Sequence, residues 1–345
     1  MDAKAVIPAS FNTQLQSPFF TTPSELRDAI YDHLIPPRAH IILRNQRLQF
    51  SACVRRNGED WPLHTGPDPI VKGKCRTAAD HLLWERLRSP WGSHFRCEEV
   101  ANGSEDSQQE FEGETMVWMN PTRVCRRMLT EFVGRMADVI VLHVNDLNTL
   151  GIVLPRDSEP EQPKNKTSTL LEHLVGHLKA LDISMRLDLS AYVNIEQESD
   201  YPSKNPDLSD LVQRFGKRDV PTSAWTALPL ALKYMPALRH LDIWLDHTHP
   251  MSWCIVNERA FLTPLFTMTL RTNPDLAISI NLPKPNPRYQ SPDRHLLWDS
   301  LEVLGTGQKS GSGRIRIIRR DRQRQSPVNW LDGTARINWR SDLSI

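Results

Sequence analysis

The chain has 345 residues, of which 39% are hydrophobic and 24% are charged, a composition typical of a water-soluble globular protein. Its 42 lysines and arginines nearly cancel its 41 aspartates and glutamates, so no net charge attracts it to nucleic acid or to an acidic membrane. No apolar run approaches the roughly 18 residues that a membrane span needs. These numbers argue against a membrane protein and against a strongly basic nucleic-acid-binding protein.

The cysteines and the N-terminus indicate a reducing compartment. The five cysteines are odd in number and widely spaced, and they include no C-x-x-C pair, which favours reduced thiols over a disulfide framework or a zinc site. The N-terminus has an acid at position 2 and lacks the apolar core of a signal peptide. We therefore expect a cytoplasmic or nuclear protein with no cofactor and no metal. The cysteines are Cys53, Cys75, Cys97, Cys125 and Cys254.

The first element expected in chain order is a helix that begins at Pro23. Thr22 stands three residues before Glu25, which is the spacing of a capping box, and Pro23 occupies the first helical position. We expect the preceding residues 1–16 to be a disordered tail.

The apolar residues of this helix recur at helical spacing and form one stripe. Leu26, Ile30 and Leu34 make up the stripe, and Tyr31 flanks it. Pro36 follows where the helix must stop. The stripe is expected to face either the protein's own core or a partner.

Two further patterns precede residue 119. Residues 39–52 alternate between apolar and polar side chains as a strand does. Residues 98–114 hold seven acids and no base, which predicts a solvent-exposed loop.

Five later segments show helical periodicity followed directly by strand alternation. In residues 170–190, leucines at helical spacing give way to Leu181, Ile183, Met185 and Leu187, which alternate with polar residues. The spacing between the segments is irregular, which favours an irregular two-layer arrangement over a regular solenoid. The other segments are 123–144, 228–247, 258–282 and 295–318.

The strict alternation predicts how the helices are placed. A strand that is apolar on one side only is buried on one face, so the helices should pack on one side of the sheet. We predict an α/β or α+β fold with helices on one face, like an irregular leucine-rich-repeat protein. The polar face should carry Asp182, Arg186, Asp188, Asp242, Trp244, Asp246, Ser279, Asn281, Arg314 and Arg316.

Trp244 is unusual on this polar face. It stands between Asp242 and Asp246 in "LDIWLDH". A loop such as 283–293 could cover its ring, or the ring could anchor a partner, as exposed tryptophans in interfaces do. The candidate partner surface consists of Arg186, Asp242, Trp244 and Asp246.

Motifs for chemistry are weak. His173 and His177 are one helical turn apart, but Leu174 occupies the position where a zincin has glutamate. His247 and His249 lie close in sequence to Cys254, a pattern too loose to define a metal site. We therefore predict no catalytic residues and no metal ligands, and the protein is not expected to be an enzyme.

Two other segments suggest phosphate or nucleic acid only superficially. Residues 305–313, "GTGQKSGSG", are predicted to follow a helix and precede a strand, whereas a phosphate loop connects a strand to a helix. Residues 314–324 hold six arginines, but they alternate with isoleucine at their start and lack aromatic residues for base stacking. We expect only weak, non-specific nucleic-acid binding.

The opening segment resembles a known family. "SPFFTTPSELRDAIYDHLI" at residues 17–35 is similar to the signature F-x-x-L-P-x-E-[LI]-R-x-x-I-Y-x-x-L of a large group of fungal proteins that are described as F-box-like or uncharacterised. "WGSHFRCEE" at 91–99 and "NPTRVCRRMLTEFV" at 120–133 resemble later stretches of that group. "MPALRHLDIWL" at 235–245 is similar to its amphipathic repeats. The resemblance covers roughly residues 17–250.

The resemblance implies a substrate adaptor of a cullin-type ubiquitin ligase. An F-box-like helix would bind a Skp-type linker, which connects it to the cullin, and the later helix–strand units would capture an unknown protein target. The chain departs from the family in having Thr22 where leucine is usual and a strand pattern at 39–52 where a full F-box has helices. The implied linker-binding residues are Pro23, Leu26, Ile30, Tyr31 and Leu34.

Three alternatives to the adaptor stay open. The F-box-like helix could be only a core element of an uncharacterised domain, an enzyme site could be assembled from distant residues, or the arginine-rich end could bind nucleic acid. In each case we expect an F-box-like region with strands at 17–118, helix–strand units at 119–320 and a C-terminal tail at 321–345.

Overall fold

The fold is given by a computed structural model. It describes residues 17–45, 47–54, 86, 89–102, 125–154, 166–199, 222–248, 253–273, 275–285, 287, 290–296 and 315–320. The two predicted tails, the acidic residues 103–114 and the glycine-rich residues 305–313 lie outside these described residues.

The described residues contain a seven-stranded sheet with the order β2-β1-β3-β4-β5-β6-β7. β1 and β2 form an antiparallel hairpin whose turn includes Asn45 at a φ of 50°. All the remaining neighbouring pairs, from β1–β3 to β6–β7, are parallel. The strands are β1 (Arg38–Arg44), β2 (Arg47–Ala52), β3 (Val141–Val144), β4 (Ala180–Leu187), β5 (His240–His247), β6 (Ala277–Pro283) and β7 (Ile315–Arg320).

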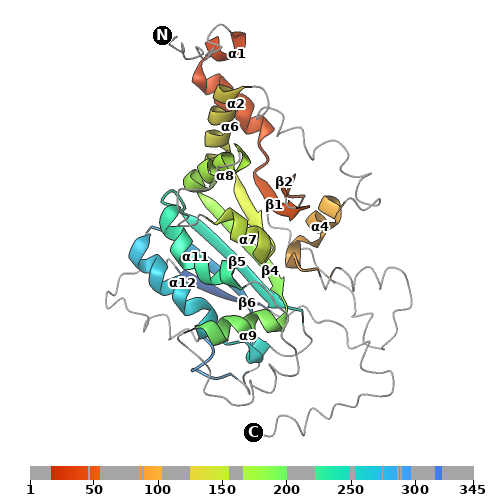
Figure 1. Cartoon of the computed structure of the whole chain (residues 1–345), viewed down its shortest axis with the longest axis vertical. Coiled ribbons are helices and arrows are strands. Elements are labelled where there is room, and N and C mark those ends of the chain that lie inside the picture. The colour runs from red at the N-terminus through yellow and green to blue at the C-terminus, as the bar shows by residue number, and fades with distance from the viewer. Residues whose placement is uncertain are drawn as a thin grey trace, which may run out of the picture.

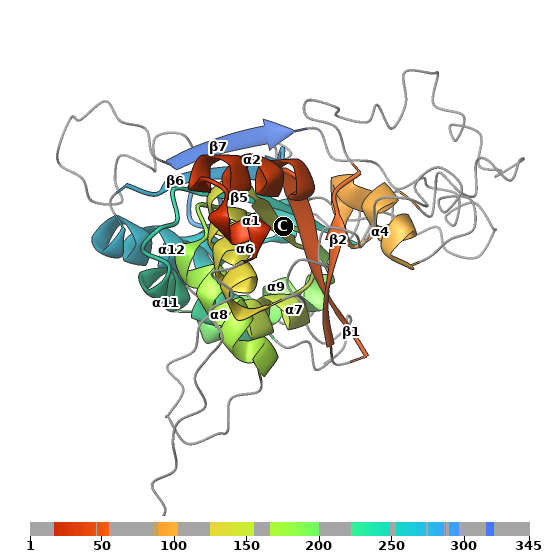
Figure 2. The ribbon, with the colours of Figure 1, turned by 90° about the horizontal axis from the view of Figure 1, so that it is seen from above.

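Helices connect the parallel strands and gather on one face of the sheet (Figure 1; Figure 2). Because the strands from β3 to β6 follow the chain order and crossovers between parallel strands are right-handed, the helices that connect these strands return on the same side. No helix in the described part of the chain has both the length and the apolar character to cross a membrane. The helices of this face are α6 (Arg126–Val139), α7 (Leu147–Val153), α8 (Lys166–His177), α9 (Leu189–Glu198), α11 (Ser223–Ala231) and α12 (Glu258–Thr272).

The core lies between this helical layer and the sheet. Apolar side chains that are level with one another on neighbouring strands form continuous buried rows across the sheet, and the helices cover these rows. The predicted two-layer fold with helices on one face is therefore confirmed. One such row consists of Ala39, Leu142, Leu181, Leu241 and Ile278, and the next of Ile41, Val144, Ile183, Ile243 and Ile280.

The opposite face of the sheet is polar but partly covered. The short helix η1 (Gly92–His94) and α4 (Phe95–Asn102) belong to a segment that lies against it. The amide of Arg186 donates to the carbonyl of Pro90 at 2.7 Å, and the Ser184 hydroxyl donates to the Trp91 carbonyl at 3.3 Å. The alternation correctly identified a polar face, but it gave no sign that residues 89–102 cover part of it.

The prediction that a capping box begins the opening helix is wrong. A short helix α1 (Pro18–Thr21) precedes α2 (Ser24–Leu34), and the Thr22 hydroxyl donates to the carbonyls of Pro18 and Phe19 instead of capping α2. Pro23 is the N-cap residue and has no side-chain hydrogen-bond donor or acceptor to offer. The predicted end of the helix before Pro36 is correct.

Three boundaries also differ from the sequence predictions. Residues 39–52 form the β1–β2 hairpin and not one strand. Residues 98–102 of the predicted acidic loop belong to α4. Asp188 was placed on the strand face, but β4 ends at Leu187 because the Asp188 carboxylate accepts the amide of Leu189, at 3.0 Å, and begins α9.

Candidate functional site

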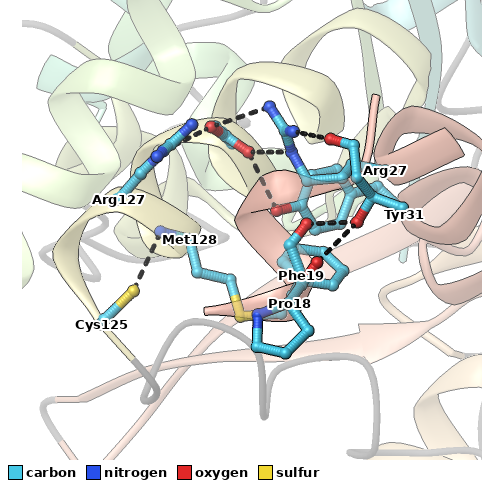
Figure 3. A network of polar contacts seen from close by, with 9 residues as sticks. Pro18, Phe19, Arg27, Tyr31, Cys125, Arg127 and Met128 are labelled. Carbon is cyan, nitrogen blue, oxygen red and sulfur yellow. Dashed lines mark hydrogen bonds and ion pairs between the residues drawn. The ribbon is translucent and has the colours of Figure 1, made fainter. Parts of the chain in front are cut away.

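The inner face of α2 is fixed to α6 by a network of charged groups (Figure 3). The guanidinium of Arg27 donates to the two carboxylate oxygens of Glu131 at 3.0 and 3.3 Å, and also to the Thr22 carbonyl at 2.6 Å. The same carboxylate accepts the Tyr31 hydroxyl at 3.3 Å and the Arg127 guanidinium at 3.0 Å. Both carboxylate oxygens of Glu131 therefore accept hydrogen bonds. A partly buried charge needs such bonds to be stable.

Tyr31 is the apolar centre of this contact. Its ring is fully buried and meets the rings of Phe19 and Phe132 edge to face at 5.9 and 5.6 Å. Burial and the adjacent Glu131 carboxylate raise the pKa of Tyr31 to about 12. Burial alone would raise the pKa of Glu131, but its hydrogen bonds from Arg27 and Arg127 lower the value below the ordinary range.

The outer face of α2 presents the other half of the predicted linker-binding set. The side chains of Leu26 and Ile30 are 55% and 43% exposed, and Pro23 is exposed as well. Leu34 is half-buried against the core, and Tyr31 is buried. The five predicted residues therefore divide between two faces of one helix. Sequence reasoning missed Arg27, whose partner Glu131 lies 104 positions away.

The predicted sheet surface around Trp244 is only partly accessible. The Trp244 ring is half-buried, and Gly92 lies so close to it that an added Cβ would be 2.3 Å from a ring carbon. The guanidiniums of Arg320 and Arg186 stand 4.0 and 5.6 Å from the ring. The prediction named residues 283–293 as a cover, but the structure places Gly92 there.

The charged members of this predicted surface differ in exposure. Asp242 is exposed, whereas Arg186 and Asp246 are buried. Arg186 donates to the Ser89 carbonyl at 3.0 Å, and the Asp246 carboxylate lies 3.6 Å from the Arg320 guanidinium. The alternation correctly placed these side chains on one face, and their partner role stays a prediction.

A cluster of histidines and cysteines lies on the same polar face, near the β1–β2 hairpin. His40 is on β1, Cys53 directly follows β2, His94 is in η1 and Cys97 is in α4. The two sulfur atoms are 3.7 Å apart, and His94 Nδ1 lies 3.5 Å from the Cys53 sulfur and 3.7 Å from the Cys97 sulfur. One ligand atom from each of these four residues lies within 4.8 Å of all the others.

The hydrogen bonds of His40 determine where its proton lies. The Asn145 side-chain amide donates to the Ser184 carbonyl at 3.1 Å, so the Asn145 oxygen must be the atom that faces His40 Nδ1, at 2.7 Å. His40 therefore carries its proton on Nδ1. Its other nitrogen, Nε2, bears a lone pair, and it is buried without a hydrogen-bond partner among the described residues.

His143 and Asp182 stand beside this cluster. The His143 ring stacks on His40 at 4.8 Å and approaches the His94 ring to 4.6 Å. His143 Nδ1 lies 3.1 Å from an Asp182 oxygen. Burial works to raise the pKa of Asp182, but the neighbouring imidazoles, His143 first, hold it below the ordinary value.

The electrostatics of the cluster favour neutral imidazoles and a thiolate. Burial lowers the pKa of His40, and it lowers the pKa of His94 to about 4. The hydrogen bond between the Cys53 and Cys97 sulfurs is the largest influence on the pKa of Cys53, and it lowers that pKa despite burial of the thiol. Neutral imidazole nitrogen and thiolate sulfur are the forms in which histidine and cysteine bind transition metals.

Sequence reasoning did not single out these four side chains. The only local signal is the H-x-x-C spacing of His94 and Cys97 inside the "WGSHFRCEE" segment. His40 and Cys53 join it only because the hairpin brings the two ends of "AHIILRNQRLQFSAC" together, where the Cys53 amide donates to the Arg38 carbonyl at 2.9 Å.

The histidine pairs that the sequence did suggest lie elsewhere. His173 and His177 are exposed neighbours on α8 with ring centroids 4.6 Å apart. His247 is buried and stacks on Trp253 at 5.7 Å, while His249 lies outside the described residues. Known proteins give no guide to any of these sites, because the chain matches no family model, no curated protein and no solved structure.

Proposed function

We propose that the protein is a non-catalytic interaction protein that binds a Skp-type linker through the outer face of α2, as an adaptor of a cullin-type ubiquitin ligase. The observation that carries this proposal is the division of α2 into two faces. Arg27 and Tyr31 hold the inner face to α6, while Leu26 and Ile30 on the outer face are exposed.

A helix held in this way is a rigid docking element. Leu26 and Ile30 are four positions apart, so their side chains are neighbours on one surface of the helix. Burying an exposed leucine or isoleucine against a partner contributes about 1.5–3 kcal/mol. His33 is exposed three positions after Ile30 on the same helix, so it supplies a polar edge beside the apolar pair.

The rival interpretation treats α2 as only a core element. The core contacts of α2 are made by its inner residues, with Tyr31 at their centre. A charge placed at Leu26 or Ile30 should therefore leave the fold intact, and its effect on linker binding can be measured separately from stability.

The proposal is tested by affinity purification of the full chain from fungal cells. The wild-type protein should recover a Skp-type linker and a cullin, and Leu26→Asp or Ile30→Asp should abolish this recovery. Far-UV circular dichroism and the melting temperature should stay at wild-type values. Ser24→Asp is the matched control, because it places the same charge at an exposed position of α2 that is two residues before Leu26 and faces away from the apolar pair.

Two outcomes would contradict the proposal. If a folded Leu26→Asp variant recovered the linker as well as the wild type does, the outer face of α2 would not be the docking site. If both substitutions unfolded the protein, the pair would belong to the protein's own core.

A further inference from the structure

We propose that His40, Cys53, His94 and Cys97 bind one Zn²⁺ ion in a tetrahedral structural site. The three measured separations among the two sulfurs and His94 Nδ1 are 3.7, 3.5 and 3.7 Å. A tetrahedral ion with Zn–S bonds of about 2.3 Å and Zn–N bonds of about 2.0–2.1 Å requires about 3.8 Å between sulfurs and about 3.6 Å between sulfur and nitrogen. The three separations agree with these values, and the ligand atoms of all four residues lie within 4.8 Å of one another.

The fourth corner belongs to Nε2 of His40. This nitrogen is buried, carries the lone pair and has no hydrogen-bond partner among the described residues. Zinc-bound histidines usually donate their other ring N–H to an oxygen that fixes the ring. Asn145 supplies that oxygen at 2.7 Å and is itself held by its bond to the Ser184 carbonyl. Asn145 is therefore a positioning residue for the site.

The charges of the site also fit a divalent ion. Two thiolates and two neutral imidazoles form a neutral complex with Zn²⁺, which removes the cost of burying an unpaired charge. Two sulfur and two nitrogen ligands suit zinc better than magnesium or calcium, which prefer oxygen. Four protein ligands leave no open position for a substrate, so the ion would be structural and not catalytic.

A second cluster, His94, His143 and Asp182, offers a competing position for an ion. It supplies one ligand fewer, contains no sulfur and shares His94 with the first cluster. A disulfide between Cys53 and Cys97 is the other competing state, since both cysteines are reduced in the structure and their sulfurs are 3.7 Å apart. The experiment below distinguishes the zinc site from both.

The position of the site indicates what the ion would do. Two of its ligands come from the β1–β2 hairpin region and two from η1 and α4, so the ion would tie residues 92–102 to the edge of the sheet. Gly92, which lies on the Trp244 ring, is in the same segment. This proposal is independent of linker binding through α2, because none of the four ligands belongs to that helix.

The first measurement uses the full wild-type chain, purified without chelator under reducing conditions. Elemental analysis should find about one zinc per chain, and X-ray absorption should show two sulfur and two nitrogen ligands at about 2.3 and 2.0–2.1 Å. Co²⁺ in place of zinc should give the visible absorption of tetrahedral cobalt thiolate. A protein that binds no zinc after reconstitution, or binds it without sulfur, would overturn the proposal.

Variants then locate the ion. Cys53→Ser and Cys97→Ser should lower the zinc content at least about tenfold, and Asn145→Ala should weaken binding about 10–100-fold. Cys254→Ser is the matched control, because it removes a buried thiol outside the cluster and should retain zinc. Asp182→Asn should also retain zinc. Loss of zinc in Asp182→Asn with retention in Cys97→Ser would place the ion in the other cluster.

The wild-type measurements do not depend on whether the cysteine variants fold. Mass spectrometry of the wild-type protein, lysed into denaturant with chelator and an alkylating reagent but no reductant, should find Cys53 and Cys97 alkylated, as expected of thiols that were reduced in the cell. A Cys53–Cys97 disulfide in that sample would overturn the zinc site in favour of a redox pair.

Discussion

The α2–α6 contact and the histidine–cysteine cluster both bury polar groups close to β1, but they satisfy them differently. At the first, the Glu131 carboxylate accepts bonds from Arg27, Arg127 and Tyr31, and the network is complete. At the second, His40 leaves a buried nitrogen without a partner among the described residues. A complete network indicates a structural role, whereas an incomplete one in a well-packed region indicates a place for a ligand.

The largest change in stability should come from removing the Tyr31 ring at the centre of the α2–α6 contact. Tyr31→Ala is expected to lower the free energy of unfolding by about 3–5 kcal/mol, because it removes a fully buried ring. Leu26→Ala, on the exposed face of the same helix, should change it by less than about 0.5 kcal/mol. Urea denaturation of both variants measures the difference, and equal costs would mean that the two faces of α2 are not distinct.

The next effect concerns the segment that carries half of the cluster. Gly92 has a φ of 58°, and a Cβ there would overlap the Trp244 ring, so Gly92→Ala should cost about 2–4 kcal/mol. Gly134→Ala is the control, because nothing lies within 4 Å of the added Cβ and alanine favours the helix. It should stabilise the protein by about 0.5–1 kcal/mol. A neutral Gly92→Ala would show that residues 89–102 are not seated on the sheet.

A smaller effect should follow from breaking the hydrogen bond that orients His40. Asn145→Leu removes the acceptor of His40 Nδ1 and the donor to the Ser184 carbonyl, leaving buried polar groups unpaired. The expected cost is about 1–3 kcal/mol, measured by denaturant unfolding with zinc removed by chelator. Asn145→Asp retains an acceptor for His40 and serves as the comparison. Equal stability of wild type and Asn145→Leu would contradict the contribution of these two hydrogen bonds.

The smallest effect is the dependence of the complete network on pH. The pKa of Glu131 is lower in the folded state than its ordinary value of 4.5. The ionised carboxylate therefore adds to the free energy of unfolding above pH 4.5, and this contribution is lost as the pH falls through the lower pKa of the folded state. We expect about 0.5–1 kcal/mol, since the side chain is partly exposed. The difference in unfolding free energy between wild type and Glu131→Gln should therefore shrink between pH 5 and pH 3. A constant difference would exclude the ionised carboxylate as its source.

The sequence was informative where periodicity is strict. The alternation of Leu181, Ile183, Met185 and Leu187 was sufficient to predict β4 and the side on which the helices pack. The end of that strand was missed, because capping by Asp188 depends on a hydrogen bond that alternation does not reveal. Local patterns therefore gave the layers of the fold but not all of its boundaries.

Neither the α2 anchor nor the histidine–cysteine cluster could be derived in the same way. Arg27 and Glu131 are 104 residues apart, and Cys53 and Cys97 are 44 residues apart. Both pairs are brought together by the tertiary structure, because β1 pairs with β3 and η1 contacts β4 and β5 on the polar face. The odd number of cysteines argued against a metal site, but a cluster of two cysteines and two histidines uses only part of the cysteine set.

The order of the strands has a further consequence for how the chain can be assembled. β3 pairs with β1, the first strand of the hairpin, and each later strand from β4 to β7 is added next to the one synthesised before it. The sheet can therefore lengthen in one direction while the chain is still leaving the ribosome, with no strand inserted between earlier ones. At every stage the newest strand is an unprotected edge that the next one covers. β7 is the last strand among the described residues, and its arginines fix it to other elements: Arg319 pairs with Glu258 of α12 and Arg320 donates to the Leu245 carbonyl on β5.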